Sequence, residues 1–231
     1  MRCFVGTSGW AYDWNEGGDL KWYVTNSRLN AIELNMSFYR FPFPSQVNSW
    51  AKYGSSLAWL VKVNRLITHV FRLSDRAYKT WIKFKSLFSK LDPCVHFYLF
   101  QLPPTFTPKF RSRVEAFIRR SKLGSRFALE FRNEVWFTEE NVEWAKKMGI
   151  TLVSVDAPEF PLKLFLTSDA LYLRMHGRTA WYAHEYSRRE LEEVVERILE
   201  LRPKRVYVMF NNDHAMLRNA REMLELLIKM C

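Results

Sequence analysis

Eight short apolar segments alternate with helical patterns along this chain, and this alternation limits the folds open to it. Each segment is long enough for one buried strand, and most of the intervening sequence repeats its apolar residues with the 3.6-residue period of a helix. Continuously apolar strands separated by helices are typical of a parallel sheet covered on both sides. The apolar segments are Arg2–Gly6, Ala31–Ser37, Leu57–Asn64, His96–Gln101, Phe127–Arg132, Thr151–Asp156, Leu171–His176 and Arg205–Phe210. Eight such units in 231 residues predict an α/β fold, a closed (β/α)8 TIM-type barrel, for which about 250 residues is typical.

The helical patterns differ in strength. Ser187 and Glu190 form an S-x-x-E capping box ahead of apolar residues at helical spacing, which predicts a helix after the seventh strand. Thr107 and Pro108 suit the N-cap and first position of a helix after the fourth strand. The segment APEFPLKLFLTS after the sixth strand carries two prolines and no clear period, so the helix there is expected to be weak or missing.

A single barrel domain over residues 1–231 is expected, because no long linker or low-complexity segment divides the chain. An open doubly wound sheet is the alternative, but no G-x-G-x-x-G turn follows the first strand. No run of about 18 apolar residues occurs, so no membrane span is expected. The cysteines are odd in number, far apart and without a C-x-x-C pair, which indicates neither a disulfide framework nor a zinc site in Cys3, Cys94 and Cys231. A reduced, cytoplasmic protein is the resulting expectation.

Polar residues gather at the carboxyl ends of the predicted strands. Residues two apart on a strand point to the same face, and the carboxyl ends of barrel strands meet at one rim, where active sites of this fold lie. Four strands end in two polar residues separated by one apolar residue: Glu33 and Asn35, Lys62 and Asn64, Glu130 and Arg132, and Arg174 and His176. The other strands add Thr7, Ser8, Gln101, Asp156, Asn211, Asn212 and Asp213. The sequence therefore predicts a polar pocket at this rim.

A buried ion-pair network is the alternative interpretation of these charges, with Glu33 and Glu130 neutralising the neighbouring cations. Purely structural networks also contain charged partners. However, burying so many charges costs several kcal/mol per ion unless each is well paired. A functional pocket is therefore the preferred interpretation of the whole set.

Seven motifs occur in order along the chain: VGTSGWAYDW, IELNMSFYRFP, VKVNRLITH, FQLPPTF, LEFRNEVWF, YLRMHGR and VMFNND. In this order they resemble the motifs of the YecE-like family, catalogued as domain of unknown function 72, over residues 4 to 224. The resemblance implies a TIM-type barrel and supplies no established reaction. The segment NEGGDLKWYVTNS after Trp14 looks shorter than the usual family pattern.

Two kinds of chemistry fit the rim less well. Glycoside hydrolysis needs two carboxylates flanking a bond, and Glu33 with Glu130 would supply them. Barrel glycosidases of the common retaining type resemble one another in having their acids on strands four and seven, where this chain has Gln101 and His176. A Schiff base at Lys62 ranks lower still, since a neighbouring glutamate would keep the amine protonated.

A divalent metal is allowed by the residue types but not favoured, and the cofactor stays open. Glu130, Asp156 and His176 on three consecutive strands would form one side of a metal site. Against this, cations share the same rim and the sequence has no HxH or HExxH spacing. We therefore assign no metal ligands.

The expected catalytic residues are His176, Glu130, Glu33 and Asp156. His176, with a reference pKa of about 6.5, suits proton transfer at neutral pH. Arg174 is expected to hold an anionic group because a guanidinium keeps its proton, and Glu130 to orient one of these two residues. The remaining predicted ligand-binding residues are Arg132, Lys62, Asn35, Asn211, Gln101, Trp10, Tyr39 and His69. Cations with amide donors suit phosphate or carboxylate, and aromatic rings stack on a base or a sugar.

The net charge of +11 is concentrated in one part of the chain. Between Lys62 and Arg126 there are 15 Lys or Arg against three carboxylates, a net of +12, so the rest of the chain carries −1. This predicts a positive outer face over residues 72–126 that binds nucleic acid weakly and without sequence preference. Two hypotheses follow: an enzyme, preferably a hydrolase, for a phosphate-containing substrate such as a nucleotide or nucleic acid, or a non-catalytic protein that binds nucleic acid or a small ligand.

Overall fold

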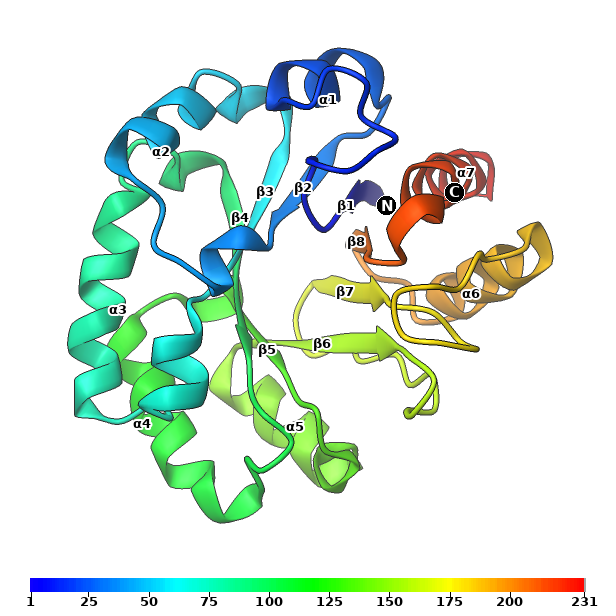
Figure 1. The fold of residues 1–231 in the computed structure, drawn as a ribbon. Helices are drawn as coiled ribbons and strands as arrows, with labels where there is room; N and C mark the ends of the chain where they lie inside the picture. Colours follow the sequence, from blue (N-terminus) through cyan, green and yellow to red (C-terminus); the bar gives the residue numbers. More distant parts are fainter. Residues whose placement is uncertain (231) are drawn as a thin grey trace.

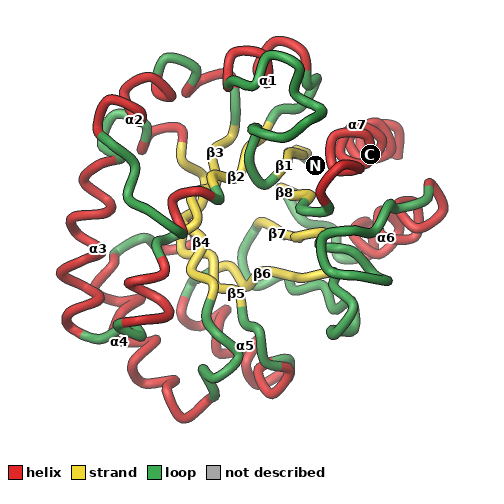
Figure 2. The backbone as a smooth tube through the Cα atoms, viewed as in Figure 1, coloured by secondary structure: helices red, strands yellow, loops and turns green. Residues whose placement is uncertain are grey.

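A closed barrel of eight parallel strands forms the centre of the molecule in the computed structural model, which describes residues 1–230 (Figures 1 and 2). Each strand pairs with the next in the chain, and β8 pairs with β1, which closes the sheet. The strands are β1 (Arg2–Thr7), β2 (Ala31–Leu34), β3 (Ala58–Lys62), β4 (Val95–Gln101), β5 (Phe127–Glu130), β6 (Thr151–Asp156), β7 (Ala170–Met175) and β8 (Arg205–Phe210). The (β/α)8 prediction is confirmed; Cys231, grouped with the cysteines above, lies outside the described residues.

Seven α-helices within residues 1–230 lie around the outside of the barrel (Figure 2). They are α1 (Leu20–Asn26), α2 (Pro44–Ala51), α3 (Asp75–Leu87), α4 (Arg111–Ser121), α5 (Glu139–Met148), α6 (Arg188–Glu200) and α7 (Met216–Met230). No helix joins β6 to β7, as the sequence predicted, because Pro158 and Pro161 lack the N–H that a helix interior needs. None of the helices in this part of the chain is long and apolar enough to cross a membrane.

Local signals in the sequence set several helix ends. The Ser187 side chain accepts a hydrogen bond from Glu190 N, and the Glu190 carboxylate accepts one from Ser187 N at 2.8 Å, so α6 begins with the predicted capping box. Helix α5 ends at Gly149, which adopts a left-handed φ of 66°. The strand predicted for Ala31–Ser37 is shorter than expected, because a 3-10 helix (Met36–Phe38) follows β2 almost at once.

The inward-facing residues fill the barrel in layers. Small residues and large aromatic ones together form the apolar cluster of the interior, which consists of Phe4, Ala31, Ala58, Leu60, Phe97, Leu99, Ala128, Val153, Ala170, Tyr172, Tyr207 and Met209. Alternate residues of a strand point to the same face. The residue two positions after Ala31, Leu60, Ala128 and Tyr172 is therefore the next inward residue toward the carboxyl-end rim, and in each case it is charged.

Candidate functional site

A buried network of charged side chains lies above the apolar layers of the barrel. Glu33 on β2, Glu130 on β5 and Arg174 on β7 have no exposed surface. Arg174 Nε and Nη2 donate to the two Glu33 carboxylate oxygens at 2.8 and 2.7 Å, and Arg174 Nη1 donates to Glu130 Oε2 at 2.7 Å. The single guanidinium thus joins two carboxylates across the barrel.

Both carboxylates have further hydrogen-bond donors. Ser8 Oγ and the Tyr172 hydroxyl donate to Glu33 at 2.7 and 2.6 Å, and Arg132 Nε donates to Glu130 Oε1 at 2.5 Å. Burial alone would raise the pKa of both carboxyl groups, but the neighbouring cations outweigh it. They lower the pKa of Glu130 to about 2 and that of Glu33 below its ordinary value. Both groups are therefore ionised at neutral pH.

His176, also fully buried, is held as a hydrogen-bond acceptor. Arg174 Nη1 and Arg132 Nη2 each lie 3.1 Å from His176 Nε2, and a guanidinium nitrogen can only donate. The Asn211 side-chain nitrogen Nδ2, also a donor, lies 3.1 Å from His176 Nδ1, so N–H donors face both ring nitrogens. Burial and then the charges of Arg174, Arg132 and Lys62 keep the pKa of His176 well below its ordinary value. The imidazole is neutral at physiological pH.

Lys62 differs from the other charged groups of the network. Its residue surface is 6% exposed, and its Nζ lies 4.3 Å from the centre of the Phe38 ring. Among residues 1–230, no carboxylate forms an ion pair with Nζ and no side chain hydrogen-bonds it. Burial, followed by the charge of Arg174, lowers the pKa of Lys62 to about 7, against the opposing effect of Glu130 and Glu33. Lys62 therefore exists as both amine and ammonium near neutral pH.

A loop between β7 and α6 covers one side of this network. The Trp181 ring lies 4.7 Å from the Arg132 guanidinium carbon and 5.4 Å from the His176 ring. Gly177, with φ of 114°, allows the loop to fold back, since a Cβ there would come within 2.4 Å of the Ala180 carbonyl oxygen. A cavity of about 210 Å³ lies beneath the loop, lined by Gln101, Pro104, Arg132, Glu159, Phe160, Trp181 and Tyr182. Arg132 thus connects the buried network to an open space.

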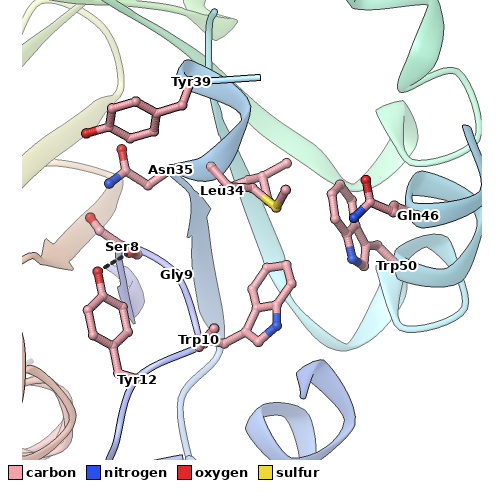
Figure 3. Close-up of a pocket in the computed structure, with 11 residues that line it drawn as sticks. Ser8, Gly9, Trp10, Tyr12, Leu34, Asn35, Tyr39, Gln46 and Trp50 are labelled. Carbon is pink, nitrogen blue, oxygen red and sulfur yellow. Dashed lines mark hydrogen bonds between the residues drawn. The ribbon is translucent and has the colours of Figure 1, made fainter. Parts of the chain in front are cut away.

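A larger cavity of about 450 Å³ lies on the other side of the mouth, between the loops after β1 and β2 (Figure 3). Three of the predicted ligand-binding residues, Trp10, Asn35 and Tyr39, line it. Ser8 belongs to its wall as well and also donates to Glu33, so the cavity borders the network. The wall includes Tyr12, Gln46 and Trp50, and the loop opposite adds Trp181. Tyr12 had been expected to line the pocket with Trp10 and Tyr39. Gln46, Trp50 and Trp181 were not among the predicted site residues, because they lie further from the strand ends and carry no strand periodicity that would place them.

Two predicted site residues lie apart from the network. Val153 faces the barrel interior, so Asp156, three residues further along β6, faces the outer side, where Arg178 Nε donates to it at 3.0 Å. Burial raises the pKa of Asp156 in spite of Arg178. His69 lies in a π-helical turn (Leu66–Val70), with Nδ1 2.9 Å from the Thr68 hydroxyl and a pKa lowered to about 4 by burial and then Lys62. Asp156 thus lies at the carboxyl end of its strand, as predicted, but its side chain pairs with Arg178 and not with Glu33, Glu130 or Arg174.

The other predicted residues meet at the rim: Glu33, Glu130, Arg174, His176, Asn211, Arg132 and Lys62 in or beside the network, Gln101 in the smaller cavity, and Trp10, Asn35 and Tyr39 in the larger one. In the part of the chain that the structure describes, no group of three or more His, Cys, Asp or Glu side chains is arranged to hold a metal ion.

A closed barrel of parallel strands, surrounded by helices and carrying its polar cluster at the carboxyl ends of the strands, defines a TIM-type barrel protein. The family model described as "Protein of unknown function DUF72" matches residues 4–230. The chain belongs to this family, as the motif resemblance indicated.

Solved structures of the family superimpose over nearly the whole chain. A DUF72 family protein from Thermotoga maritima is 27% identical, with a TM-score of 0.79 and coverage of 100% of this chain and 99% of that chain. One from Enterococcus faecalis is 20% identical, with a TM-score of 0.81 and coverage of 98% and 95%. The structure of SacUVDE shares the fold alone, at 8% identity, a TM-score of 0.58 and coverage of 98% and 99%. No curated protein matches the sequence.

Proposed function

We propose that this DUF72 protein is an enzyme, preferably a hydrolase, that holds the phosphate group of a nucleotide or nucleic acid at the carboxyl-end rim of its barrel. The observation that carries the proposal is the placement of two cations at the mouth. Lys62 has no carboxylate partner among residues 1–230, and Arg132 lines a cavity. Ammonium and guanidinium groups are the side chains that proteins use to bind phosphate.

The charge balance of the network supports an anionic ligand. The carboxylates Glu33 and Glu130 are matched by the guanidiniums of Arg174 and Arg132, so a protonated Lys62 leaves the mouth with one excess positive charge. A bound phosphate would neutralise this charge and raise the pKa of Lys62 in turn. Arg174 was expected to hold the anion, but its N–H groups already donate to Glu33, Glu130 and His176. We therefore assign anion binding to Lys62 and Arg132.

Lys62 is also the rim group best suited to proton transfer at neutral pH, because its pKa is about 7. His176 accepts hydrogen bonds from two guanidiniums and stays neutral, so we assign it to positioning rather than to proton transfer. In a hydrolysis, a water molecule would attack the phosphorus atom. Lys62, in its ammonium form, would give a proton to the leaving oxygen. Glu130 would keep both arginines in place.

Exposed aromatic rings on both sides of the mouth support a ligand that carries a base or a sugar. Tyr39 beside the larger cavity is 66% exposed, and Tyr182 beside the smaller one is 46% exposed. Base–aromatic stacking is sequence-tolerant and contributes about 1–3 kcal/mol per base. These rings would add affinity to the phosphate contact.

A second, weaker contact with nucleic acid is proposed for the outer face of α3 and α4. These helices adjoin, since Tyr78 on α3 donates to the Arg120 carbonyl on α4 at 3.1 Å. Part of the positive charge is already paired: Lys85 and Arg126 with Asp92, Arg119 with Glu115, Arg120 with Asp75, and Arg111 with Glu140. The exposed cations Arg76, Lys79, Lys83, Lys90, Lys109, Arg113 and Lys122 would supply weak, non-specific binding.

Calorimetric titration with inorganic phosphate, mononucleotides and short oligonucleotides tests the rim, followed by chromatography for products. Lys62→Met and Arg132→Leu should weaken phosphate binding at least about tenfold, whereas Lys147→Met on the exposed face of α5 should leave it unchanged. Absence of phosphate and nucleotide binding would refute the proposal. The saturated network and the neutral His176 favour the alternative of a non-catalytic binding protein, which predicts lysine-dependent binding with no product from any of these ligands.

A further inference from the structure

We propose that Lys62 is a nucleophilic amine that forms an imine with small aldehydes or ketones entering the mouth of the barrel. This activity goes beyond phosphate binding and does not rest on it, because imine formation needs only a neutral amine and a carbonyl group. The substrate class that the site suits is a small carbonyl compound that carries an anionic group.

The surroundings of Lys62 favour a neutral amine. The charged groups around it are Glu33 on β2, Glu130 and Arg132 at the end of β5, and Arg174 on β7, with His69 on the turn after β3. The two carboxylates already balance the two guanidiniums through direct hydrogen bonds. An ammonium at Lys62 would therefore be an uncompensated charge in a buried cluster, which is costly.

The hydrogen bonds of Glu33 and Glu130 bear on whether Lys62 is protonated, which was the argument against an imine at this residue in the sequence analysis. A neighbouring glutamate was expected to keep Lys62 protonated. Instead, Glu33 accepts from Ser8, Tyr172 and Arg174, and neither Glu33 nor Glu130 forms an ion pair with Lys62. The Lys62 nitrogen lies over the face of the Phe38 ring at 4.3 Å, which attracts an ammonium more weakly than a paired carboxylate does.

The neutral fraction of Lys62 follows from its lowered pKa. With a pKa of about 7, about half of the side chain is amine at pH 7. An ordinary lysine of pKa about 10.4 is neutral to only about 0.04% at that pH. Lys62 therefore carries roughly a thousand times more of the nucleophilic form than a surface lysine.

The reaction balances without a further reagent. The amine nitrogen attacks the carbonyl carbon, and a proton passes from nitrogen to oxygen to give a carbinolamine. Loss of water then yields the neutral imine, which takes up a proton from solvent to become the iminium ion, and addition of water reverses the sequence. Arg132, which lines the cavity beneath the β7–α6 loop, would hold the carboxylate or phosphate of the carbonyl compound, and this anionic group would balance the iminium charge.

Reductive trapping tests the inference on the whole, unmodified protein. Formaldehyde, as the smallest probe, and glyoxylate, as an anionic one, are added at pH 7.5 with sodium cyanoborohydride, and modified lysines are located by peptide mass spectrometry. Lys62 should react roughly tenfold faster than the exposed Lys147, with a rate that levels off above pH about 7. Glyoxylate should show a larger preference for Lys62 than formaldehyde does.

Modification of surface lysines with no adduct at Lys62 for formaldehyde would overturn the inference, as would a Lys62 rate that keeps rising to pH 10. Lys62→Arg, which keeps the charge but not the reactive amine, should abolish the specific adduct. Inorganic phosphate separates the two proposals. If Lys62 is trapped, but phosphate neither binds nor slows the trapping, the imine inference stands and the phosphate site is refuted. If phosphate binds but Lys62 is not trapped, the phosphate site stands and the imine inference is refuted.

Discussion

Replacing Lys62 by Met should stabilise the protein at neutral pH and flatten the rise of its stability between pH 7 and 9. In the folded protein the pKa of Lys62 is about 7, whereas in the unfolded chain it returns to its ordinary value of 10.5. Met is similar in length, is apolar and adapts to irregular space, so it should fill the site beside the Phe38 ring without a cavity. The substitution therefore removes mainly the cost of deprotonating or burying the charge.

The sign follows from proton counts. Between pH 7 and 10.5 the unfolded chain holds the Lys62 proton and the folded protein does not, so the free energy of unfolding rises with pH in this window. At about 1.4 kcal/mol per pKa unit, the shift from 10.5 to about 7 corresponds to a cost of roughly 4 kcal/mol at pH 7, falling to roughly 2 kcal/mol at pH 9. The wild-type protein should therefore gain about 2 kcal/mol between these pH values relative to Lys62→Met.

Urea unfolding followed by tryptophan fluorescence at pH 7, 8 and 9 measures this difference. The histidines near Lys62 do not interfere, because burial lowers the pKa of His69 to about 4 and that of His176 well below its ordinary value, outside this window. Lys147→Met, on an exposed position of α5, serves as the matched control and should follow the wild-type curve.

Two results would refute the reasoning. If Lys62→Met lowers stability at pH 7, then the ammonium is stabilised by the carboxylates in the folded protein. If the wild-type protein and Lys62→Met change in parallel from pH 7 to 9, then the pKa of Lys62 is not depressed. Either result would also weaken the imine inference, which needs the neutral amine.

Three further predictions test other parts of the structure. His176 should stay neutral from pH 8 down to 5.5 in ¹⁵N-detected NMR, because two guanidiniums face Nε2 and the Asn211 amide nitrogen faces Nδ1. The exposed His214, whose pKa is raised by Asp13, should titrate in this range, and a titrating His176 would contradict the assigned contacts. Glu33→Gln should lower the free energy of unfolding, measured with urea, by about 3–5 kcal/mol, because the buried Arg174 guanidinium loses its carboxylate partner. The exposed Glu134→Gln should change it little, and equal effects of the two substitutions would mean that the network adds no stability. Binding of DNA or RNA in a mobility-shift titration should appear at low salt and fall steeply as salt rises, since residues 72–126 contact phosphates; binding that survives high salt would exclude this explanation.

Much of the fold could be predicted from the sequence because it depends on local periodicity. Continuous apolar strands separated by helical patterns have few packing solutions, and eight of them close into a barrel. The same periodicity placed Glu33, Glu130 and Arg174 together, since each stands two residues beyond an inward apolar residue of its own strand. The missing helix after β6 followed from its prolines.

The sequence could not predict which way β6 presents Asp156. Its final residue falls on the outer side because Val153 faces inward, and the side that a strand presents to the barrel interior is set by its pairing with β5 and β7. A polar residue at the end of a strand shows only that the rim is near. The alternation must be anchored to a neighbouring strand before its side is known.

Only the tertiary structure decided the ionisation of the network, because the pKa of a buried group depends on distances between residues far apart in the chain. Arg174 meets Glu33 across 141 positions of sequence and Glu130 across 44. By engaging both carboxylates it leaves Lys62 without an ion pair to any carboxylate of residues 1–230, and it donates to His176. The residue types at the rim were fixed by the sequence, whereas which of them remain free to bind or react was determined by how the closed barrel brings them together.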